Sequence, residues 1–276
     1  MIHHMIPGYK EKLLGLLVYF DEVCEKNHLR YYAIGGTFLG AIRHKGFIPW
    51  DNDIDVAMPR VDYDKVVEII SNRNDGFVIE TPQSQAKDYL YSVAKLYDTT
   101  TTLIENLKVE TVRGVYLDIF PIDGIGNSME EVSKNYKRIN FLNNIFAVRT
   151  CAIRPQRAWW KNLAIHLANV VPERVFSTKK LLVKLDNLCR KHDFEKSEYV
   201  GVLLTQYGTK YIMPRPLFDK RRRYQFENLT IYGVEDYEAY LSLLFGDWKK
   251  LPPKEQQVEG HDYKYIDLNK SYLRGQ

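Results

Sequence analysis

Cysteine is scarce in this chain, which has three cysteines among 276 residues. Cys24, Cys151 and Cys189 lie far apart, with none of the short spacings that bind a metal ion. An odd and sparse set of this kind excludes a disulfide-stapled scaffold and a cysteine-ligated metal centre. We therefore expect reduced thiols, as in a cytosolic protein.

Long apolar runs are also missing from the sequence. No stretch approaches the roughly 20 apolar residues that a membrane-spanning helix needs. Residues 1–5 show no apolar segment of the kind found in a secretory signal. Together with the cysteine pattern, these absences predict a cytoplasmic protein.

Other absences narrow the possible functions. Internal repeats, low-complexity segments and Gly/Ser-rich linkers are lacking, and 45% of residues are hydrophobic, which indicates a globular chain. We find no Ser-His-Asp or Cys-His nucleophile set and no Walker-type lysine loop. The net charge of +4 is mild, so it fits an anionic substrate or a membrane surface without demanding nucleic acid.

The most informative stretch that is present carries three carboxylates at alternating positions. Asp51, Asp53 and Asp55 lie in the segment 47–58, which we predict to be one strand ended by Pro59. Residues two apart in a strand share a face, so the carboxylates would repel one another unless a cation lay between them. Mg²⁺, or Mn²⁺ in its place, prefers such oxygen ligands. The alternative is a solvated acidic loop.

A pair of glycines precedes these carboxylates. Gly35 and Gly36 follow a short predicted strand at 31–34 and lead into a predicted helix at 37–44. Glycine lets backbone N–H groups approach a phosphate, and a helix N-terminus adds positive charge there. A glycine pair alone often marks a plain turn. Arg43, near the end of the helix, would either contact phosphate or remain solvated.

The rest of the chain mixes helix and strand patterns. Helical spacing predicts helices over 9–27, 62–72 and 235–245. Strand patterns cover 77–80, 90–97, 101–105, 115–120, 199–206 and 224–231. This order predicts an α/β (α+β) fold, with a central mixed sheet and flanking helices.

A helix-rich stretch begins at Ser128. The run Ser128-Met129-Glu130-Glu131 is a capping-box pattern, and helical spacing continues to about His192 with interruptions at Pro155 and Pro172. We predict three parts of the chain, which are a catalytic core over 1–127, a helical subdomain over 128–195, and C-terminal strands and a helix over 196–276 that complete the core.

Three segments carry a resemblance to a known family. The segment 35–58 combines a Gly-Gly-Thr-x-Leu-Gly-x-x-Arg-His start with a Gly-Phe-Ile-Pro-Trp-Asp-x-Asp-x-Asp finish. It resembles the signature of the LicD family of phosphotransferases, with Phe38 in a variable slot and Asn52 where a further Asp is common. The segment 114–124 resembles the downstream strand of that family, and 245–253 resembles a C-terminal motif.

The resemblance implies a nucleotidyltransferase-like fold and a transfer reaction, with fukutin-related enzymes as distant relatives. The chain would move phosphocholine from CDP-choline to a hydroxyl of a cell-surface glycan or its lipid-linked precursor, and CMP would leave. The family also includes enzymes thought to use other CDP-activated alcohols, such as ribitol or glycerol. The sequence does not choose between these donors.

The resemblance also assigns site residues. Asp53 and Asp55 match the metal-binding pair of the family, and Asp118 matches a third carboxylate that would bind metal and help to activate the acceptor hydroxyl. Lys95 matches a lysine often seen at this place, and it would bind a nucleotide phosphate or pair with an aspartate. Together with the phosphate contacts expected near the glycine pair, this gives a predicted substrate-binding set of Gly35, Gly36, Thr37, Arg43 and Lys95.

Some assignments around the third carboxylate stay open. Asp118 could instead be a turn residue at the end of a strand. Asp123 and Gly124 fit turn chemistry better than metal binding, so Asp123 ranks below Asp118. Asp51 would lie behind the metal ligands or bind a second metal ion.

Two other functions and a membrane contact also remain open. A nucleotidyltransferase that adds a nucleotide to a small molecule or RNA would share the carboxylates but release pyrophosphate. A non-catalytic scaffold is disfavoured because all three aspartates are present. The basic run 220–223 and the pair Trp159-Trp160 could touch the inner face of a membrane, although a helical-subdomain core also explains the tryptophans.

Overall fold

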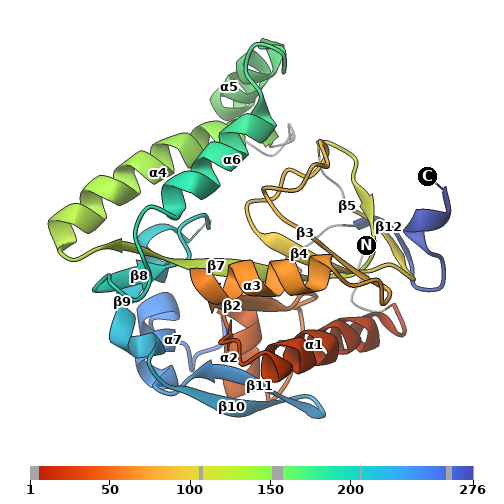
Figure 1. The fold of residues 1–276 in the computed structure, drawn as a ribbon, viewed down its shortest axis with the longest axis vertical. Coiled ribbons are helices and arrows are strands. Elements are labelled where there is room, and N and C mark those ends of the chain that lie inside the picture. The colour runs from red at the N-terminus through yellow and green to blue at the C-terminus, as the bar shows by residue number, and fades with distance from the viewer. Residues whose placement is uncertain (1–5, 106–107, 151–157, 206, 259–262, 276) are drawn as a thin grey trace.

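The computed structural model describes residues 6–105, 108–150, 158–205, 207–258 and 263–275. A mixed sheet runs through the centre of the molecule (Figure 1). In that view the helices at residues 129–150, 159–170 and 178–189 lie above the sheet, and the N-terminal helix and a C-terminal hairpin lie below it. This arrangement confirms the predicted mixed α/β class.

The main sheet has seven strands, two of which carry the predicted aspartates Asp55 and Asp118. Five strands lie in the order β1 (Tyr32–Ala33), β2 (Asp55–Pro59), β7 (Tyr116–Gly126), β4 (Ala94–Asp98) and β3 (Phe77–Glu80). The β2–β7 pair is parallel, whereas the β1–β2, β4–β7 and β3–β4 pairs are antiparallel. Beside the second half of β7 the sheet continues through β8 (Tyr199–Gly201) and β9 (Ile212–Pro214).

Two smaller sheets and a set of helices surround this sheet. The small sheets are the hairpin of β10 (Arg221–Phe226) with β11 (Leu229–Val234), and the set β12 (Tyr263–Asp267), β5 (Thr102–Glu105) and β6 (Val112–Arg113). The α-helices are α1 (Tyr9–Lys26), α2 (Gly35–Arg43), α3 (Arg60–Ser71), α4 (Met129–Thr150), α5 (Trp159–Val170), α6 (Thr178–Cys189) and α7 (Tyr237–Phe245). Short 3₁₀ turns lie at Gly208–Tyr211, Arg215–Phe218, Lys254–Gln256 and Tyr272–Gly275.

One large apolar core lies between the sheet and the helices below it. On α1, Leu13, Leu17 and Phe20 are buried at helical spacing, and they share this core with the fully buried Val56 of β2 and Ile119 of β7. Burial of that apolar face is what holds α1 against the sheet. Two smaller clusters belong to α4 and α6. Their buried members are Ile125, Val132, Ile139, Cys189 and Leu203 in one, and Phe146, Leu181, Leu182 and Leu185 in the other.

The prediction of a single strand over 47–58 was wrong. The chain turns at Pro49 and Trp50, where the Asp51 N–H donates to the carbonyl of Ile48, and the strand begins only at Asp55. Burial nevertheless alternates through this stretch, because Ile54 is buried between two half-buried aspartates. A turn supported by proline therefore replaces the first half of the predicted strand.

Two later strand predictions also need correction. The segment 224–231, predicted as one strand, contains the end of β10, a turn and the start of β11. Glu227, in the turn, has a φ of 54°. Only Glu227 and Asn228 separate the two strands, and a two-residue turn of this kind explains why one apparent strand is two. The predicted strand 199–206 is shorter, since β8 ends at Gly201.

The helical part follows the sequence prediction closely. The Ser128 hydroxyl accepts from the Glu131 N–H at 3.2 Å, which is the first bond of a capping box, and the Glu131 carboxylate accepts from the N–H of Asn127, one residue before the cap, at 2.7 Å. Pro172 lies in the break between α5 and α6, as expected. Pro155 lies outside the described residues. The boundaries of the three predicted parts stay a prediction.

Candidate active site

Three titratable side chains form a row across the main sheet. In the parallel pair β2–β7, Asp55 lies opposite Asp118, and in the antiparallel pair β4–β7, Asp118 lies opposite Lys95. Residues in register on adjacent strands project from the same face, about 5 Å apart from strand to strand. The fold therefore places two carboxylates and one ammonium group side by side.

Lys95 forms a buried ion pair with the predicted third carboxylate. Its Nζ lies 2.8 Å from Oδ1 and 3.1 Å from Oδ2 of Asp118, and the two residues are only 2% and 6% exposed. The same ammonium lies 3.4 Å from the ring centroid of Tyr116 and 4.5 Å from that of Tyr91. Of the two roles predicted for Lys95, the structure shows pairing with an aspartate. Because Asp118 lies within β7 and carries this pair, it is not a turn residue.

Sequence reasoning missed an acidic and aromatic cluster behind this ion pair. The Tyr116 hydroxyl donates to Glu105 at 2.8 Å, and the Tyr91 hydroxyl donates to the same carboxylate. Burial, and then the charge of Glu105, raises the pKa of Tyr91 far above its usual range, so that phenol stays protonated. The sequence held one signal for this cluster. Glu105 lies at the end of the predicted strand 101–105, and the sequence analysis gave its side chain no role.

The start of α2 packs directly against the aspartates. Gly35 has a φ of 54°, and a Cβ there would lie 3.5 Å from Oδ2 of Asp55. A Cβ on Gly36 would lie 2.3 Å from a carboxylate oxygen of Asp51. The Thr37 hydroxyl accepts from the Asp55 N–H at 2.8 Å. Gly35, Gly36 and Thr37 therefore bring the helix N-terminus against the carboxylate loop, where its positive end favours anions.

Tyr211 adds a phenol to this corner of the site, and the sequence did not identify it. A Cβ on Gly35 would lie 3.0 Å from the Tyr211 hydroxyl. Burial raises the pKa of Tyr211 well above its usual value, and the charges of Asp55 and Asp53 act in the same direction. A phenol that stays protonated beside two carboxylates is a hydrogen-bond donor for an oxygen bound there.

Arg43 contacts the C-terminal motif in this structure. Its Nη1 donates to the carbonyl of Trp248 at 2.8 Å and lies 3.5 Å from that of Lys250. The residue thus joins two sequence motifs across a separation of 205 positions. A phosphate contact of Arg43 stays a prediction.

Asp123, ranked below Asp118 as a metal ligand, has a structural partner. Its carboxylate accepts two hydrogen bonds from Arg60, at 2.7 and 2.6 Å, and is fully enclosed. The predicted turn at Asp123 and Gly124 was wrong, because β7 continues through both residues to Gly126. Both partners of this bidentate pair are satisfied without a metal ion.

The oxygen donors of the row suit a divalent cation of the Mg²⁺ type. Mg²⁺ commonly takes one or two protein carboxylates and completes its shell with substrate phosphates and water. Asp55 and Asp118, in register on parallel neighbours, fit that requirement. Within the described residues, no group of three or more His, Cys, Asp and Glu side chains converges closely enough to hold a metal ion by itself. The three-ligand set Asp53, Asp55 and Asp118 stays a prediction.

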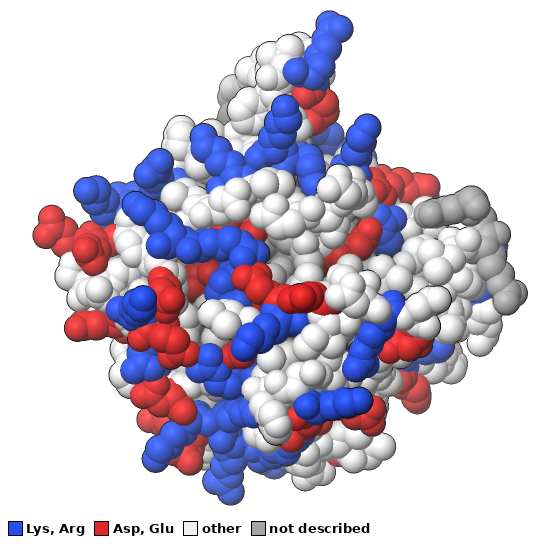
Figure 2. All heavy atoms as spheres, in the orientation of Figure 1, with Lys and Arg blue, Asp and Glu red and all other residues white. Residues whose placement is uncertain are grey.

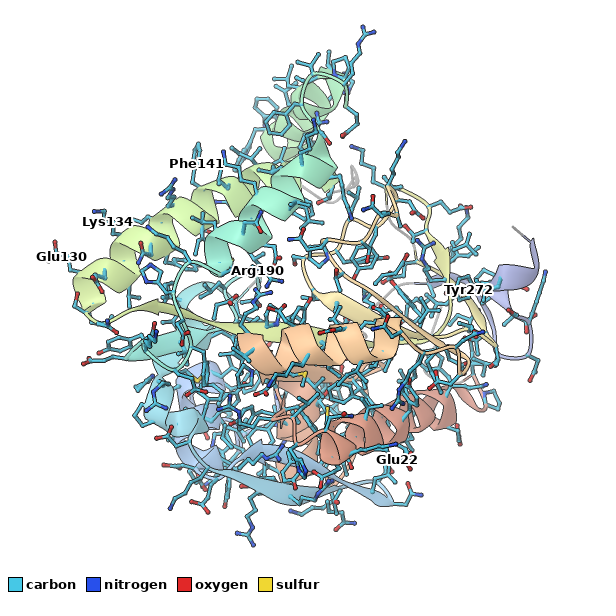
Figure 3. The ribbon with its side chains drawn as sticks, in the orientation of Figure 1. Glu22, Glu130, Lys134, Phe141, Arg190 and Tyr272 are labelled. Atoms are coloured by element: carbon cyan, nitrogen blue, oxygen red, sulfur yellow. The ribbon has the colours of Figure 1, made fainter. Side chains whose placement is uncertain are left out.

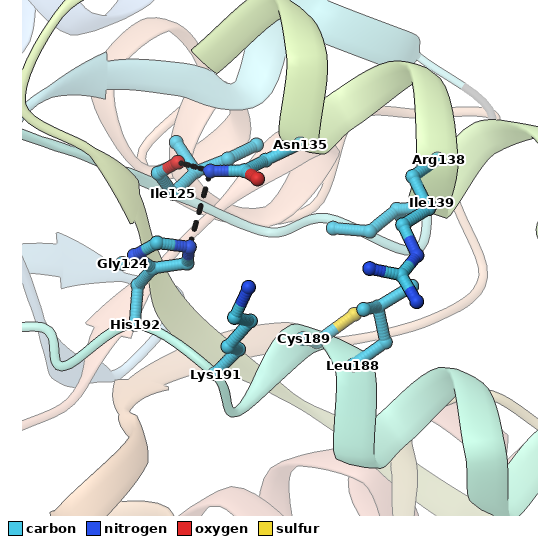
Figure 4. Close-up of a pocket in the computed structure, with 9 residues that line it drawn as sticks. All are labelled: Gly124, Ile125, Asn135, Arg138, Ile139, Leu188, Cys189, Lys191 and His192. Atoms are coloured by element: carbon cyan, nitrogen blue, oxygen red, sulfur yellow. Dashed lines mark hydrogen bonds between the residues drawn. The ribbon is translucent and has the colours of Figure 1, made fainter. Parts of the chain in front are cut away.

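A small cavity elsewhere in the molecule does not belong to this row. It lies between α4, the end of α6 and β7, lined in part by Asn135, Lys191 and His192 (Figure 4). The Asn135 side chain lies 3.1 Å from Nε2 of His192 and donates to the carbonyl of Ile125. The space is about the size of one water molecule, which is too small for a nucleotide.

Comparisons with known proteins agree with the geometry. A family model described as "LicD/FKTN/FKRP, nucleotidyltransferase domain" matches residues 28–151, which contain the whole row. The lipopolysaccharide cholinephosphotransferase LicD of Haemophilus influenzae is 31% identical over 251 residues, covering 90% of this chain and 92% of that protein.

Two uncharacterized rickettsial proteins match shorter segments. One from Rickettsia prowazekii is 31% identical over 96 residues, covering 34% of this chain and 32% of its own length. One from Rickettsia typhi is 44% identical over 41 residues, covering 15% and 13%. With a relative matched along nearly its whole length and the family's domain centred on the carboxylate row, this chain belongs to the LicD family.

Proposed function

We propose that this chain is an Mg²⁺-dependent transferase that moves phosphocholine, or a related phospho-alcohol, from a CDP-activated donor to a hydroxyl of a cell-surface glycan or its lipid-linked precursor. CDP-choline is the first candidate donor, and CDP-ribitol and CDP-glycerol are the others. The name of the Haemophilus relative, a lipopolysaccharide cholinephosphotransferase, supports both the transferred group and the kind of acceptor.

The observation that carries the proposal is the register of Asp55 with Asp118 beside the N-terminus of α2. In phosphoryl transfer, the protein contributes chiefly by positioning the phosphates and by balancing their charge. Bound by these carboxylates and the donor phosphates, Mg²⁺ would supply positive charge to the phosphate oxygens. The backbone N–H groups of Gly35 and Gly36 are suited to the remaining phosphate oxygens.

The other residues of the site hold the row in place. Lys95 balances the charge of Asp118 and fixes the orientation of its carboxylate through both oxygens. Thr37 fixes the backbone of Asp55. Asp118, the carboxylate nearest the centre of the row, is the group that would take the proton of the acceptor hydroxyl as its oxygen attacks phosphorus and CMP leaves.

Product analysis tests the proposal. The purified chain is incubated with CDP-choline, CDP-ribitol or CDP-glycerol in turn, with lipopolysaccharide lacking phosphocholine as the acceptor. Each reaction is run with Mg²⁺ and with a chelator. Chromatography measures CMP and pyrophosphate, and mass spectrometry measures the acceptor. Asp55→Asn protein is the control for the site.

We expect CMP release that requires Mg²⁺, and an acceptor heavier by the phospho-alcohol. Release of pyrophosphate from a nucleoside triphosphate, with no CMP from any of the three donors, would instead establish a nucleotidyltransferase. Equal CMP release by the Asp55→Asn protein would show that the reaction occurs at another site.

A further inference from the structure

Helix α5 carries an apolar stripe on its outer side. Trp159, Trp160, Leu163, Leu167 and Val170 fall within a sector about 100° wide at the helical spacing. All five are exposed, from 47% for Leu163 to 76% for Trp159. A helical-subdomain core, one of the two interpretations left open by the sequence, therefore does not explain these residues.

The inner side of α5 is held by a different residue. Ile165 lies on the opposite side of the helix from the stripe and is only 4% exposed. This side faces α4, against which α5 packs. The helix therefore keeps its strongest hydrophobic face away from the body of the protein, which is unusual for a helix that serves only the fold.

The neighbouring elements also expose apolar side chains. After α5, Val175 is 72% exposed, and on α4, Phe141 is 65% exposed. Phe141, Ile145, Val171 and Phe176 line an open groove of about 430 Å³ whose walls are almost wholly apolar. Figure 3 shows Phe141 and Lys134 on the outer side of α4.

The helical part is also the basic part of the molecule. Residues 129–189 contain eleven lysines and arginines against four aspartates and glutamates, a net charge of +7, whereas the whole chain has a net charge of +4. Lys134, Arg174, Lys180 and Lys184 are exposed there. Figure 2 shows many Lys and Arg side chains, and fewer Asp and Glu, over the upper part of the molecule, where white spheres lie between them.

The basic run 220–223, the other membrane contact considered from the sequence, is partly engaged within the protein, through Arg221 and Arg223, while Lys220 and Arg222 are exposed. Arg223 pairs with Asp21 at 3.0 Å and with Glu25 at 3.3 Å. The Arg221 guanidinium lies 3.9 Å from the ring centroid of Tyr232 and donates to the carbonyl of Leu29. These contacts make Arg221 and Arg223 part of the packing of the hairpin.

We propose that the outer face of α5, with Phe141 and Val175, docks on an anionic membrane surface. The helix has 12 residues and is about 18 Å long, so it would lie in the interface rather than cross a hydrocarbon core about 30 Å thick. In the part of the chain that the structure describes, no helix is long and apolar enough to cross a membrane.

Charge favours a membrane over a second copy of this chain as the occupant. A two-fold contact would bring two surfaces of net positive charge together, which costs free energy. An anionic bilayer instead attracts the surrounding lysines and arginines while the tryptophans enter the headgroup region. The docking surface is independent of the transfer reaction, so its test does not use activity.

Vesicle sedimentation tests the surface. The full chain is mixed with vesicles of phosphatidylcholine alone or with one third phosphatidylglycerol, at low and at high salt. The stripe variant is Trp159→Ser, Trp160→Ser and Leu167→Ser. Its matched control is Val61→Ser and Leu243→Ser, which removes exposed apolar side chains from α3 and α7. Circular dichroism checks that both variants are folded.

We expect wild-type protein to pellet with the anionic vesicles at low salt and to be released at high salt. The stripe variant should lose at least about tenfold in affinity, while the control binds like wild type. The double variant Lys180→Gln, Lys184→Gln should bind the anionic vesicles about fivefold more weakly for each lysine removed. Its control, Lys65→Gln with Lys196→Gln, removes two exposed lysines elsewhere and should bind like wild type.

Tryptophan emission gives a second readout that needs no variant to be stable. Trp159 and Trp160 are exposed tryptophans, whereas Trp248 is buried. Adding anionic vesicles to wild-type protein should shift the emission to shorter wavelength. Recovery of wild-type protein in the supernatant with every vesicle, with no emission shift, would overturn the proposal. So would a concentration-dependent dimer, seen by light scattering, that the stripe variant abolishes.

Discussion

At the residue scale, the charge of the site depends on Asp55 and Asp118 lying in register and on the ion pair between Lys95 and Asp118. Asp118 shares its carboxylate with Lys95, whereas Asp55 lies against Gly35 and Tyr211. The two aspartates therefore contribute differently, even though both match carboxylates of one family. We therefore expect Asp55 to affect ligand binding, and Asp118 to affect both stability and the transfer reaction.

Replacing Asp55 should abolish transfer and leave the fold intact. Asp55→Asn keeps the size of the side chain but removes a charge from the row, so we expect CMP release to fall by about 10²-fold or more. Thermal unfolding should stay close to that of the wild type, because no buried apolar contact is lost. Asp75→Asn, at an exposed carboxylate shortly after α3, is the matched control. Near-normal turnover of Asp55→Asn would contradict the assignment.

Replacing Lys95 should destabilise the protein, unlike replacing Asp55. Lys95→Met removes the ammonium from a buried carboxylate, which costs about 3–5 kcal/mol when one member of a buried pair is lost. Adding Asp118→Asn to Lys95→Met should recover much of this free energy of unfolding, because the buried charge is then gone. Urea unfolding of the two single variants and the double variant measures the coupling. If the changes in unfolding free energy of the two single variants simply add up in the double variant, the ion pair contributes nothing to stability.

At the scale of the elements, a buried charge network joins α3, β7 and α6. Arg60 at the start of α3 binds Asp123 of β7 and, at 3.0 Å, Asp186 of α6, while Arg190 and Gln83 also donate to Asp186. Hydrogen bonds from three partners satisfy the Asp186 carboxylate, and two arginines balance the charge of the buried aspartates. The network therefore fixes the orientation of α6 relative to α3 and β7.

Acid should loosen this junction. Burial acts to raise the pKa of the Asp186 carboxyl, but the charges and hydrogen bonds of Arg60, Arg190 and Gln83 hold it below its usual value. A folded-state pKa below the unfolded value of about 3.9 stabilises the protein above that pH, and this stabilisation is lost as the pH falls through the folded-state pKa.

The measurement is the free energy of unfolding between pH 7 and pH 3. Asp186→Asn should be less stable than wild type at pH 7 and should lose less stability on acidification. Asp75→Asn, which lies outside this network, should follow the wild-type curve. Parallel curves for the wild type and Asp186→Asn would remove Asp186 from the acid response.

At the scale of the whole molecule, the core is unevenly divided. The large cluster joins residues from Tyr9 to Tyr263, so the two ends of the chain complete one core. The helical part keeps small clusters of its own around Leu182 and Leu185. Such a division predicts that the helical part can open without unfolding the sheet.

Hydrogen exchange tests that division and the predicted boundaries at 128 and 195. Leu185→Ala empties a fully buried position at a cost of about 2–5 kcal/mol, and it should speed exchange in α4 and α6 while β2 and β7 stay protected. Leu117→Ala, equally buried but in the large cluster, should speed exchange throughout. A uniform increase from both variants would show one cooperative unit.

Local patterns were sufficient for much of this protein. Helix α1, strand β3 and the capping box at Ser128 follow the sequence prediction within one or two residues, because periodicity and capping are properties of neighbouring positions. The motif around Asp53 and Asp55 was likewise sufficient to indicate the family, since its residues all lie within one short segment.

Only the tertiary structure decided what those residues touch. The Lys95–Asp118 pair depends on the register of two strands, and Arg43 reaches the carbonyl of Trp248 from 205 positions away. Register and long-range contacts are set by how whole elements pack, which no local pattern records. The same helical spacing fits an apolar face turned inward or outward, so the sequence predicted the stripe of α5, and the fold decided that it faces outward.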